Sequence, residues 1–159
     1  EYCGGMQEGH TFYGYLPGGA SGGILPATMN TIPLDFDTLQ PYGCFIGSAA
    51  VMIFSHQDKA RDAALNVMRF FEHESCGQCT PCREGTGWLW RIVSRIERGE
   101  GRPEDLDLLN DVAANIQGRT ICALGDAAAM PVRGMLKHYM DEFAYHVEHK
   151  RCLDSAQPL

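Results

Sequence analysis

The sequence predicts an α+β fold that is mainly α, in which a small four-helix bundle carries a cysteine-rich loop and follows a partial β-rich region. Glycine and proline are concentrated before residue 55, whereas apolar residues recur at helical spacing after it. The chain has 159 residues, of which 45% are hydrophobic and 21% charged, enough apolar material for a packed core. We therefore expect two domains, residues 1–54 and 55–159.

The first region is predicted to contain two strands. They are expected at Thr11 to Leu16 and at Cys44 to Phe54, and the second carries β-branched and aromatic residues. Between them, the glycine-rich run from Pro17 to Gly23 lacks the pattern of a dinucleotide-binding loop and is interpreted as a tight or flexible turn. Because two strands alone are marginally stable, the region looks like the end of a larger β-rich module.

The first two helices follow directly. Ser55 with Asp58 resembles a capping box before the first helix. Its apolar face is formed by Ala60, Ala64, Met68 and Phe71, and that of the second helix by Trp88, Leu89, Ile92 and Ile96. Gly99 is expected to end the second helix.

Two further helices complete the predicted bundle. Pro103 suits the start of the third helix, which Gly118 ends, and Asp126 or Pro131 is expected to open the fourth, which runs to about His149. The acidic residues of the third helix are interpreted as a solvated face: Glu104, Asp105, Asp107 and Asp111. Helices of this length with short connections predict a small bundle.

Charge and hydropathy exclude several classes of protein. The formal net charge is −7 and no cluster of basic residues occurs, which argues against nucleic acid as a partner. The longest uncharged apolar run, Cys44 to Phe54, has eleven residues, whereas a membrane-spanning helix needs about 20. The chain begins with Glu1 and shows no secretory signal pattern, so we expect a fragment.

Cysteines provide the strongest chemical signal. Cys76, Cys79 and Cys82 are spaced C-x2-C-x2-C on a segment that Gly77 and Pro81 are expected to keep out of regular helix. Cys122 lies between the third and fourth predicted helices. If the second and third helices form an antiparallel hairpin, the chain returns Cys122 to the triplet, and four thiols are available.

Three closely spaced thiolates and one distant thiolate suit an iron–sulfur cubane, because each of its four corners takes one sulfur and bacterial ferredoxins use the same local triplet. The site would precede the second helix, whose free amides and dipole favour an anion, with Arg83 adjacent. A tetrahedral zinc site, a thioredoxin-like C-x-x-C and a metal-free binding module with structural cysteines are the alternatives.

The remaining polar candidates are given no catalytic or metal-binding role. Trp88 and Trp90 are interpreted as core and flanking residues of the second helix. The histidines of the last helix, His138, His146 and His149, are interpreted as solvated or capping residues. The isolated cysteines are expected to be packing or surface thiols: Cys3, Cys44 and Cys152.

Two stretches carry a family resemblance. Glu74-Ser75-Cys76-Gly77-Gln78-Cys79-Thr80-Pro81-Cys82-Arg83-Glu84-Gly85 and Thr120-Ile121-Cys122-Ala123-Leu124-Gly125-Asp126 resemble the C-terminal cluster domain of the NADH-binding, FMN-containing subunit of NADH:quinone oxidoreductase (complex I). The same module occurs in NAD-linked formate dehydrogenases and NAD-reducing hydrogenases. The segment from Leu16 through Phe54 is similar to the end of the β-grasp (SLBB-type) domain that precedes the cluster domain. Its glycine-rich sequence resembles the formate dehydrogenase β-subunit more than complex I.

The resemblance implies an electron-transfer module. Its metal ligands would be Cys76, Cys79, Cys82 and Cys122, which would hold a [4Fe-4S] cluster that takes single electrons from reduced FMN. FMN and NAD(H) would be bound only in the intact parent subunit, so this fragment alone is predicted not to be catalytic. The implied partners are other subunits of the complex, including an iron–sulfur electron acceptor, and the implied location is cytoplasmic or peripheral to the inner membrane.

Overall fold

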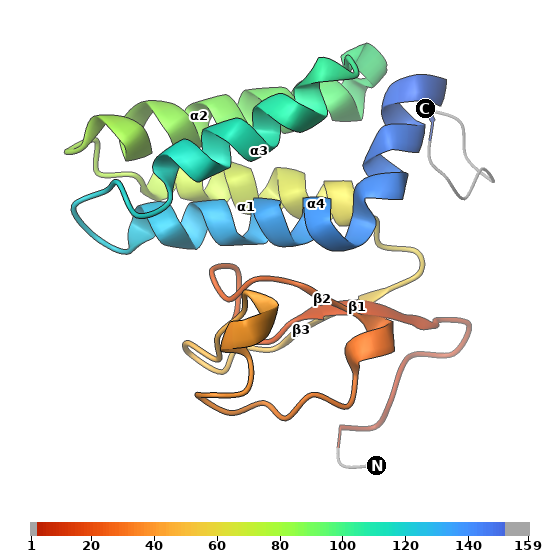
Figure 1. Cartoon of the computed structure of the whole chain (residues 1–159). Coiled ribbons are helices and arrows are strands. Elements are labelled where there is room, and N and C mark those ends of the chain that lie inside the picture. Colours follow the sequence, from red (N-terminus) through yellow and green to blue (C-terminus); the bar gives the residue numbers. More distant parts are fainter. Residues whose placement is uncertain (1–2, 152–159) are drawn as a thin grey trace.

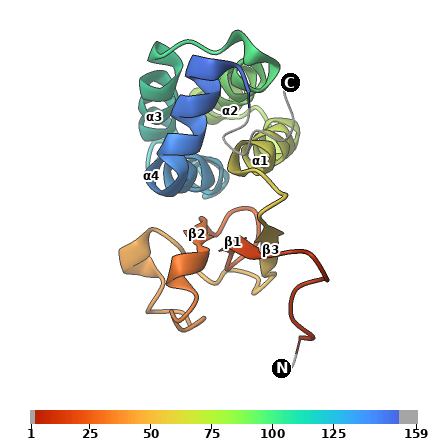
Figure 2. The same cartoon turned by 90° about the vertical axis from the view of Figure 1, so that its right-hand side faces the viewer.

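The computed structural model describes residues 3–151 and confirms the predicted α+β class. A small sheet contains β1 (Phe12–Leu16), β2 (Leu25–Pro26) and β3 (Met52–Ser55). The bundle contains α1 (Ala60–Glu74), α2 (Thr80–Arg95), α3 (Glu104–Ile116) and α4 (Leu124–His149). Short helical turns occur at η1 (Ala27–Met29), η2 (Gln40–Tyr42) and the π-helical η3 (Ile96–Glu100). The helices stack above the sheet, with α1 and α4 nearer to it (Figures 1 and 2).

The sheet has the order β2-β1-β3 and is antiparallel throughout, with Tyr15 opposite both Leu25 and Ile53. The predicted first strand is confirmed. The predicted second strand was wrong over most of its length, because only its end enters β3. Ala49 has φ +57° and interrupts an extended conformation, while Cys44 packs into a second, small core with Tyr15 and Leu25 of the sheet. Strand β2 was not predicted.

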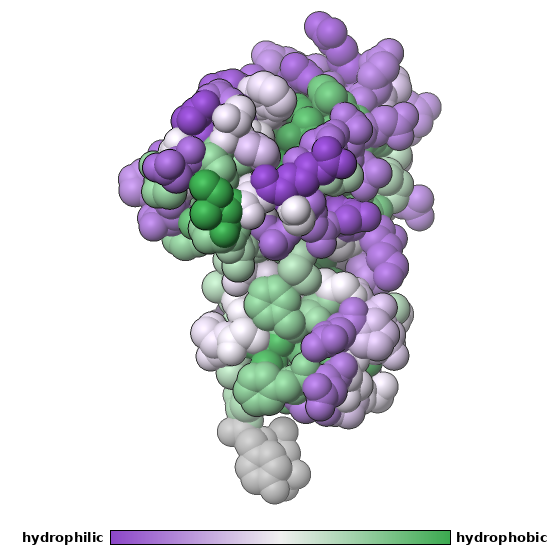
Figure 3. Space-filling view, turned by 60° about the vertical axis from the view of Figure 1, so that its left-hand side comes forward, coloured by the Kyte–Doolittle hydropathy of each residue, from purple (hydrophilic) through white to green (hydrophobic). Residues whose placement is uncertain are grey.

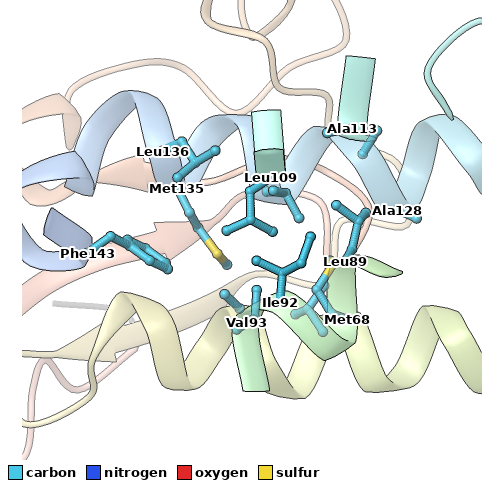
Figure 4. Close-up of a cluster of buried hydrophobic side chains, with 14 of the residues drawn as sticks. Met68, Leu89, Ile92, Val93, Leu109, Ala113, Ala128, Met135, Leu136 and Phe143 are labelled. Atoms are coloured by element: carbon cyan, nitrogen blue, oxygen red, sulfur yellow. The ribbon is translucent and has the colours of Figure 1, made fainter. Parts of the chain in front are cut away.

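The main core lies between the four helices. Figure 4 shows Met68 of α1, Leu89 and Ile92 of α2, Leu109 of α3 and Met135 of α4 pointing toward one another. All five are buried, which confirms the helical spacing of apolar residues as the signal for the bundle. No helix within residues 3–151 is both long enough and apolar enough to cross a membrane.

Two predicted helix starts were wrong. Ser55 and Asp58 do bond to each other, with Ser55 N donating to Asp58 Oδ2 at 2.8 Å, but they close a turn before α1, whose N-cap is Lys59. Helix α4 begins at Leu124, ahead of both expected positions, and Pro131 lies inside it. The helix tolerates this proline, and it bends later, where Tyr139 has non-helical φ/ψ of −130° and 24° (Figure 1).

Two predicted surface assignments also need correction. Asp105 is buried and accepts a hydrogen bond from Arg95 Nε at 2.9 Å, because its place at the start of α3 faces the end of α2. Trp88 is half exposed and is not a core residue.

The bend in α4 seats the bundle on the sheet. A Cβ atom at Gly14 would lie 2.1 Å from the Tyr139 hydroxyl oxygen, so only glycine lets strand β1 approach this ring. The Tyr13 hydroxyl donates to the buried Glu142 carboxylate one turn farther along α4. Sheet and bundle therefore meet through direct contacts as well as through the chain that joins β3 to α1.

Candidate metal centre

The connection between α1 and α2 and that between α3 and α4 lie at the same end of the bundle, on the left in Figure 1. This end is turned toward the viewer in Figure 3, where hydrophilic residues predominate over the helical part and apolar patches over the sheet part. Helices α2 and α3 pack as an antiparallel hairpin. The predicted hairpin is thereby confirmed, and Cys122 returns to the end that carries the cysteine triplet.

The α1–α2 connection is a tight turn. Gly77 has φ +76°, a left-handed conformation that follows Cys76 and reverses the chain toward α2. Arg83 Nη1 donates to the Gly77 carbonyl at 3.1 Å and holds the turn against the first turn of α2. Cys79 is the N-cap residue of α2, and no side chain caps this helix end, so its first amides keep donors for an anion.

Cys82 lies inside α2, so the prediction that Pro81 would keep this thiol out of regular helix was wrong. Proline suits the first helical turn because an amide there has no helical acceptor. Cys82 is buried, and its carbonyl accepts a hydrogen bond from Thr86 Oγ1 at 2.8 Å. Cys79 is half-buried, while Cys76 and Cys122 are exposed. The four thiols thus form a gradient from a helix-held interior thiol to two at the surface.

Close helix packing brings the two connections to the same end. A Cβ atom at Gly85 would lie 2.6 Å from Cγ1 of Ile116 and 2.7 Å from its Cδ1. The missing side chain lets the N-terminal turns of α2 approach the C-terminal turn of α3. Because α3 ends at Ile116, the segment that carries Cys122 begins beside the helix that carries Cys82.

The α3–α4 connection is organised by its own hydrogen bonds. Gly118 N donates to Asp126 Oδ1 at 2.6 Å, and Thr120 Oγ1 donates to the Cys122 carbonyl at 2.8 Å. A Cβ atom at Gly125 would lie 2.4 Å from Thr120 Cγ2, so the loop folds tightly onto the start of α4. Cys122 therefore sits on a compact turn beside Ile121, whose side chain is 76% exposed.

The other three thiols act electrostatically on Cys82. Burial is the largest cause that raises the pKa of Cys82, and the hydrogen bond with Ser75 acts in the opposite direction. Charge on Cys79, Cys122 and Cys76 raises this pKa further. Since Coulomb interactions weaken with separation, all three thiols lie within electrostatic reach of Cys82.

The donor set suits an iron–sulfur cluster. Cysteine thiolates are the ligands that such clusters take, each on a different iron, whereas a zinc ion takes its sulfurs at about 2.3 Å from one centre. Among residues 3–151, no three histidine, cysteine, aspartate or glutamate side chains lie close enough together to bind one metal ion. A charged cluster at this position would meet the unpaired amides of α2 and the nearby Arg83 guanidinium.

Cys3 and Cys44 lie apart from this site. Burial raises the pKa of Cys44 to about 11, as expected of a packing thiol, and Lys137 opposes the effect. Cys3 is exposed, and Cys152 lies outside the described residues. The glycine-rich run is a tight turn in which a Cβ atom at Gly18 would lie 2.1 Å from the Phe45 carbonyl oxygen.

One histidine departs from the prediction. His146 is fully buried, so it is neither solvated nor a cap, and burial followed by the charge of Arg61 lowers its pKa. His138 is half-buried and His149 is exposed, with its ring against that of Tyr145. Sequence reasoning missed Ser75, whose Oγ lies 3.2 Å from Cys82 Sγ. The available signal was a hydroxyl residue immediately before the first cysteine of the motif.

Comparisons with known proteins identify a family. Residues 62–146 match the model of the NADH-ubiquinone oxidoreductase-F iron-sulfur binding region. The F subunit of NADH-quinone oxidoreductase from Rickettsia typhi is 39% identical over 149 residues, which are 93% of this chain and 35% of that protein. The F 2 subunit of the Rhizobium meliloti enzyme is 42% identical over 152 residues, 96% of this chain and 36% of that protein.

A solved structure gives the same result. A crystal structure of NAD+-reducing [NiFe]-hydrogenase in the H2-reduced state superposes with a TM-score of 0.75 at 31% identity, over 84% of this chain and 23% of that one. The chain spans about a third of the length of the curated relatives that it matches. It belongs to the family of the NADH-ubiquinone oxidoreductase-F iron–sulfur binding region.

Proposed function

We propose that Cys76, Cys79, Cys82 and Cys122 are the four ligands of a [4Fe-4S] cluster in this chain. The observation that carries the proposal is the antiparallel packing of α2 and α3, which returns Cys122 to the end of the bundle that holds the cysteine triplet, although it lies forty residues after Cys82 in the sequence. Family membership supports the same cofactor, because the matched family model describes an iron–sulfur binding region.

We propose that the module transfers electrons within an NADH-linked oxidoreductase. A bound [4Fe-4S] cluster supplies one-electron redox chemistry. NADH and FMN would bind elsewhere in the longer protein, and the cluster would take single electrons from reduced FMN. The relatives' names, which describe an NADH-quinone oxidoreductase and an NAD+-reducing hydrogenase, support this class of reaction. We expect this chain alone not to oxidise NADH.

The role of the chain's own residues is to bind and to position. Helix α2 would fix the interior ligand Cys82, while the two connections present Cys76 and Cys122 at the surface. This gradient supports electron exchange at the exposed side of the site, toward a further iron–sulfur subunit as partner. We further propose that residues 1–54 are the end of a β-grasp (SLBB-like) domain, that residues 55–159 are the cluster domain, and that the protein works in the cytoplasm, free or at the inner membrane.

Anaerobic reconstitution with iron and sulfide tests the cluster directly. We expect roughly four irons and four sulfides per chain with broad visible absorbance. A zinc-stabilised binding module is the alternative, because four thiols also suit Zn²⁺, and it predicts one zinc and a colourless protein under the same treatment. One tightly held zinc that iron and sulfide do not replace would overturn the proposal.

A further inference from the structure

Ser75 lies directly between the end of α1 and the buried thiol of the candidate metal centre. As the C-cap residue of α1, it donates its backbone amide to the Phe71 carbonyl at 3.1 Å, which fixes its backbone. Its hydroxyl oxygen lies 3.2 Å from Cys82 Sγ, although the two residues are seven positions apart. Ser75 is thus placed by one helix and contacts a sulfur held by the next.

The surrounding hydrogen bonds set the direction of this contact. Gly77 N donates to Ser75 Oγ at 3.4 Å and occupies an acceptor position of the oxygen. A metal-bound thiolate carries no proton, so between it and a hydroxyl only the hydroxyl donates. With metal bound, the single hydroxyl proton of Ser75 would therefore point to the Cys82 sulfur.

Burial makes Cys82 the ligand at which one donor has the greatest effect. Its residue is 6% exposed, whereas Cys76 and Cys122 are open to water, which already solvates their sulfurs. A hydrogen bond is electrostatically stronger in a low-dielectric interior.

We propose that Ser75 is a positioning residue that raises the reduction potential of the cluster by donating a hydrogen bond to the Cys82 thiolate; this inference rests on the proposed function. Reduction adds one electron and no atoms, and the added negative charge is shared with the thiolate sulfurs. A donor to one of these sulfurs therefore stabilises the reduced form more than the oxidised form.

The test is an anaerobic redox titration of the reconstituted chain, followed by the EPR signal of the reduced cluster. We expect Ser75→Ala to lower the ratio of reduced to oxidised cluster roughly tenfold at a fixed potential, a shift of about 59 mV to more negative values. Ser75→Thr keeps the hydroxyl and should restore the wild-type ratio. Thr86→Val is the matched control, because it removes a hydroxyl that bonds to the Cys82 carbonyl and not to the sulfur.

Each outcome of the titration supports or overturns the proposed role of Ser75. An unchanged potential in Ser75→Ala, or an equal shift in Thr86→Val, overturns the inference and leaves the cluster proposal intact. If Ser75→Ala does not hold a cluster, Ser75→Gly is titrated in its place, and failure of both shows that the hydroxyl holds the cluster and does not tune it. Absence of iron from the wild-type protein defeats the proposed function itself, so the two failures are distinct.

Discussion

The two ends of the helical bundle are held together in different ways. At the end away from the thiols, charged side chains join separate elements. Arg61 of α1 pairs with Glu97 of η3, and both the Nε and Nη2 atoms of Arg95 in α2 donate to the carboxylate of Asp105 in α3. Lys150 adds a hydrogen bond from the end of α4 to the Gly101 carbonyl. This end is closed by the protein's own side chains.

At the thiol end, each connection forms hydrogen bonds only within itself and with the helices that it joins. Gly77 bonds to Ser75 and to Arg83 at the start of α2, while Gly118 bonds to Asp126 at the start of α4 and Thr120 bonds to Cys122. Across residues 3–151, no hydrogen bond or ion pair joins the two turns. The protein therefore completes one end with its own side chains, whereas at the other end the proposed cluster would bridge the two turns, as expected where metal binding contributes to folding.

The largest expected effect on cluster content comes from removing the one proposed ligand in the α3–α4 turn. Cys122→Ser leaves the triplet with no partner from the second turn, so we expect most of the iron and sulfide to be lost after anaerobic reconstitution, measured by iron and sulfide analysis. Cys3→Ser is the matched control, because Cys3 is also exposed but belongs to neither turn. A full cluster in Cys122→Ser would remove this residue from the ligand set.

Removing an ion pair at the end without thiols should lower the stability of the fold and leave the cluster content unchanged. Glu97→Ala deprives the buried Arg61 of its carboxylate partner, although Asp62 remains 3.6 Å away. We expect a loss of about 2–3 kcal/mol in the free energy of unfolding, measured by anaerobic denaturant titration, with unchanged iron content. Glu100→Ala breaks an exposed pair with Arg98 and should cost less than about 1 kcal/mol. Iron loss in Glu97→Ala would contradict the independence of the two ends.

Two glycines of α2 test how helix packing positions the thiol end. Gly85→Ala places a methyl group against Ile116 and should cost about 1–3 kcal/mol in unfolding free energy while lowering iron occupancy. Gly87→Ala meets no atom closer than 3.8 Å and should instead gain about 0.5–1 kcal/mol from helix propensity. Denaturant midpoints and iron content of both variants provide the check, and equal effects would show that close approach at Gly85 is unimportant.

The smallest expected effect concerns pH at the end without thiols. Burial, together with the charge of Arg61, lowers the pKa of His146 in the folded protein, while Asp62 and the backbone of Glu97 act in the opposite direction. The unfolded chain, with a histidine pKa of about 6.5, therefore binds the proton first. Stability is present above pH 6.5 and is lost as the pH falls through the lowered folded pKa.

The expected slope is at most about 1.4 kcal/mol per pH unit for this one proton. Between pH 7.5 and pH 5.5, the free energy of unfolding should decrease more for the wild type than for His146→Gln. Parallel curves would mean that His146 does not titrate differently in the two states. His138→Gln is a useful comparison, because the pKa of His138 is lowered as well but this residue is only half-buried.

The sequence predicted the bundle better than the sheet, for a physical reason. Apolar residues repeated every three or four positions report directly on a buried helix face, and Leu89 and Ile92 lie in the core as expected. The run from Cys44 to Phe54 is apolar without a period of two, so its length could not distinguish a strand from a packed turn. The run is broken at Gly47 and at Ala49, which both have positive φ; the glycine was a sequence signal for such a break, whereas the alanine was not.

For the site, spacing identified the thiols but not their surroundings. The hairpin of α2 and α3 followed from two amphipathic segments with a short link, and it fixed the end at which Cys122 lies. The Ser75 contact depends on the exact start of α2 at Thr80, one residue ahead of Pro81. A shift of one residue turns a helical side chain by about 100°, so such contacts lie beyond the precision of sequence patterns.

The burial gradient across the thiols has a consequence for how the protein tolerates air. Oxidants reach a cysteine sulfur according to its exposure. We therefore expect Cys76 and Cys122 to be oxidised to sulfenic and higher acids before Cys82, which is shielded inside α2. Oxidation would then begin at the two exposed thiols and reach the buried Cys82 last. Under the proposed function, a neighbouring protein that covers these two exposed thiols would protect the cluster from oxidants.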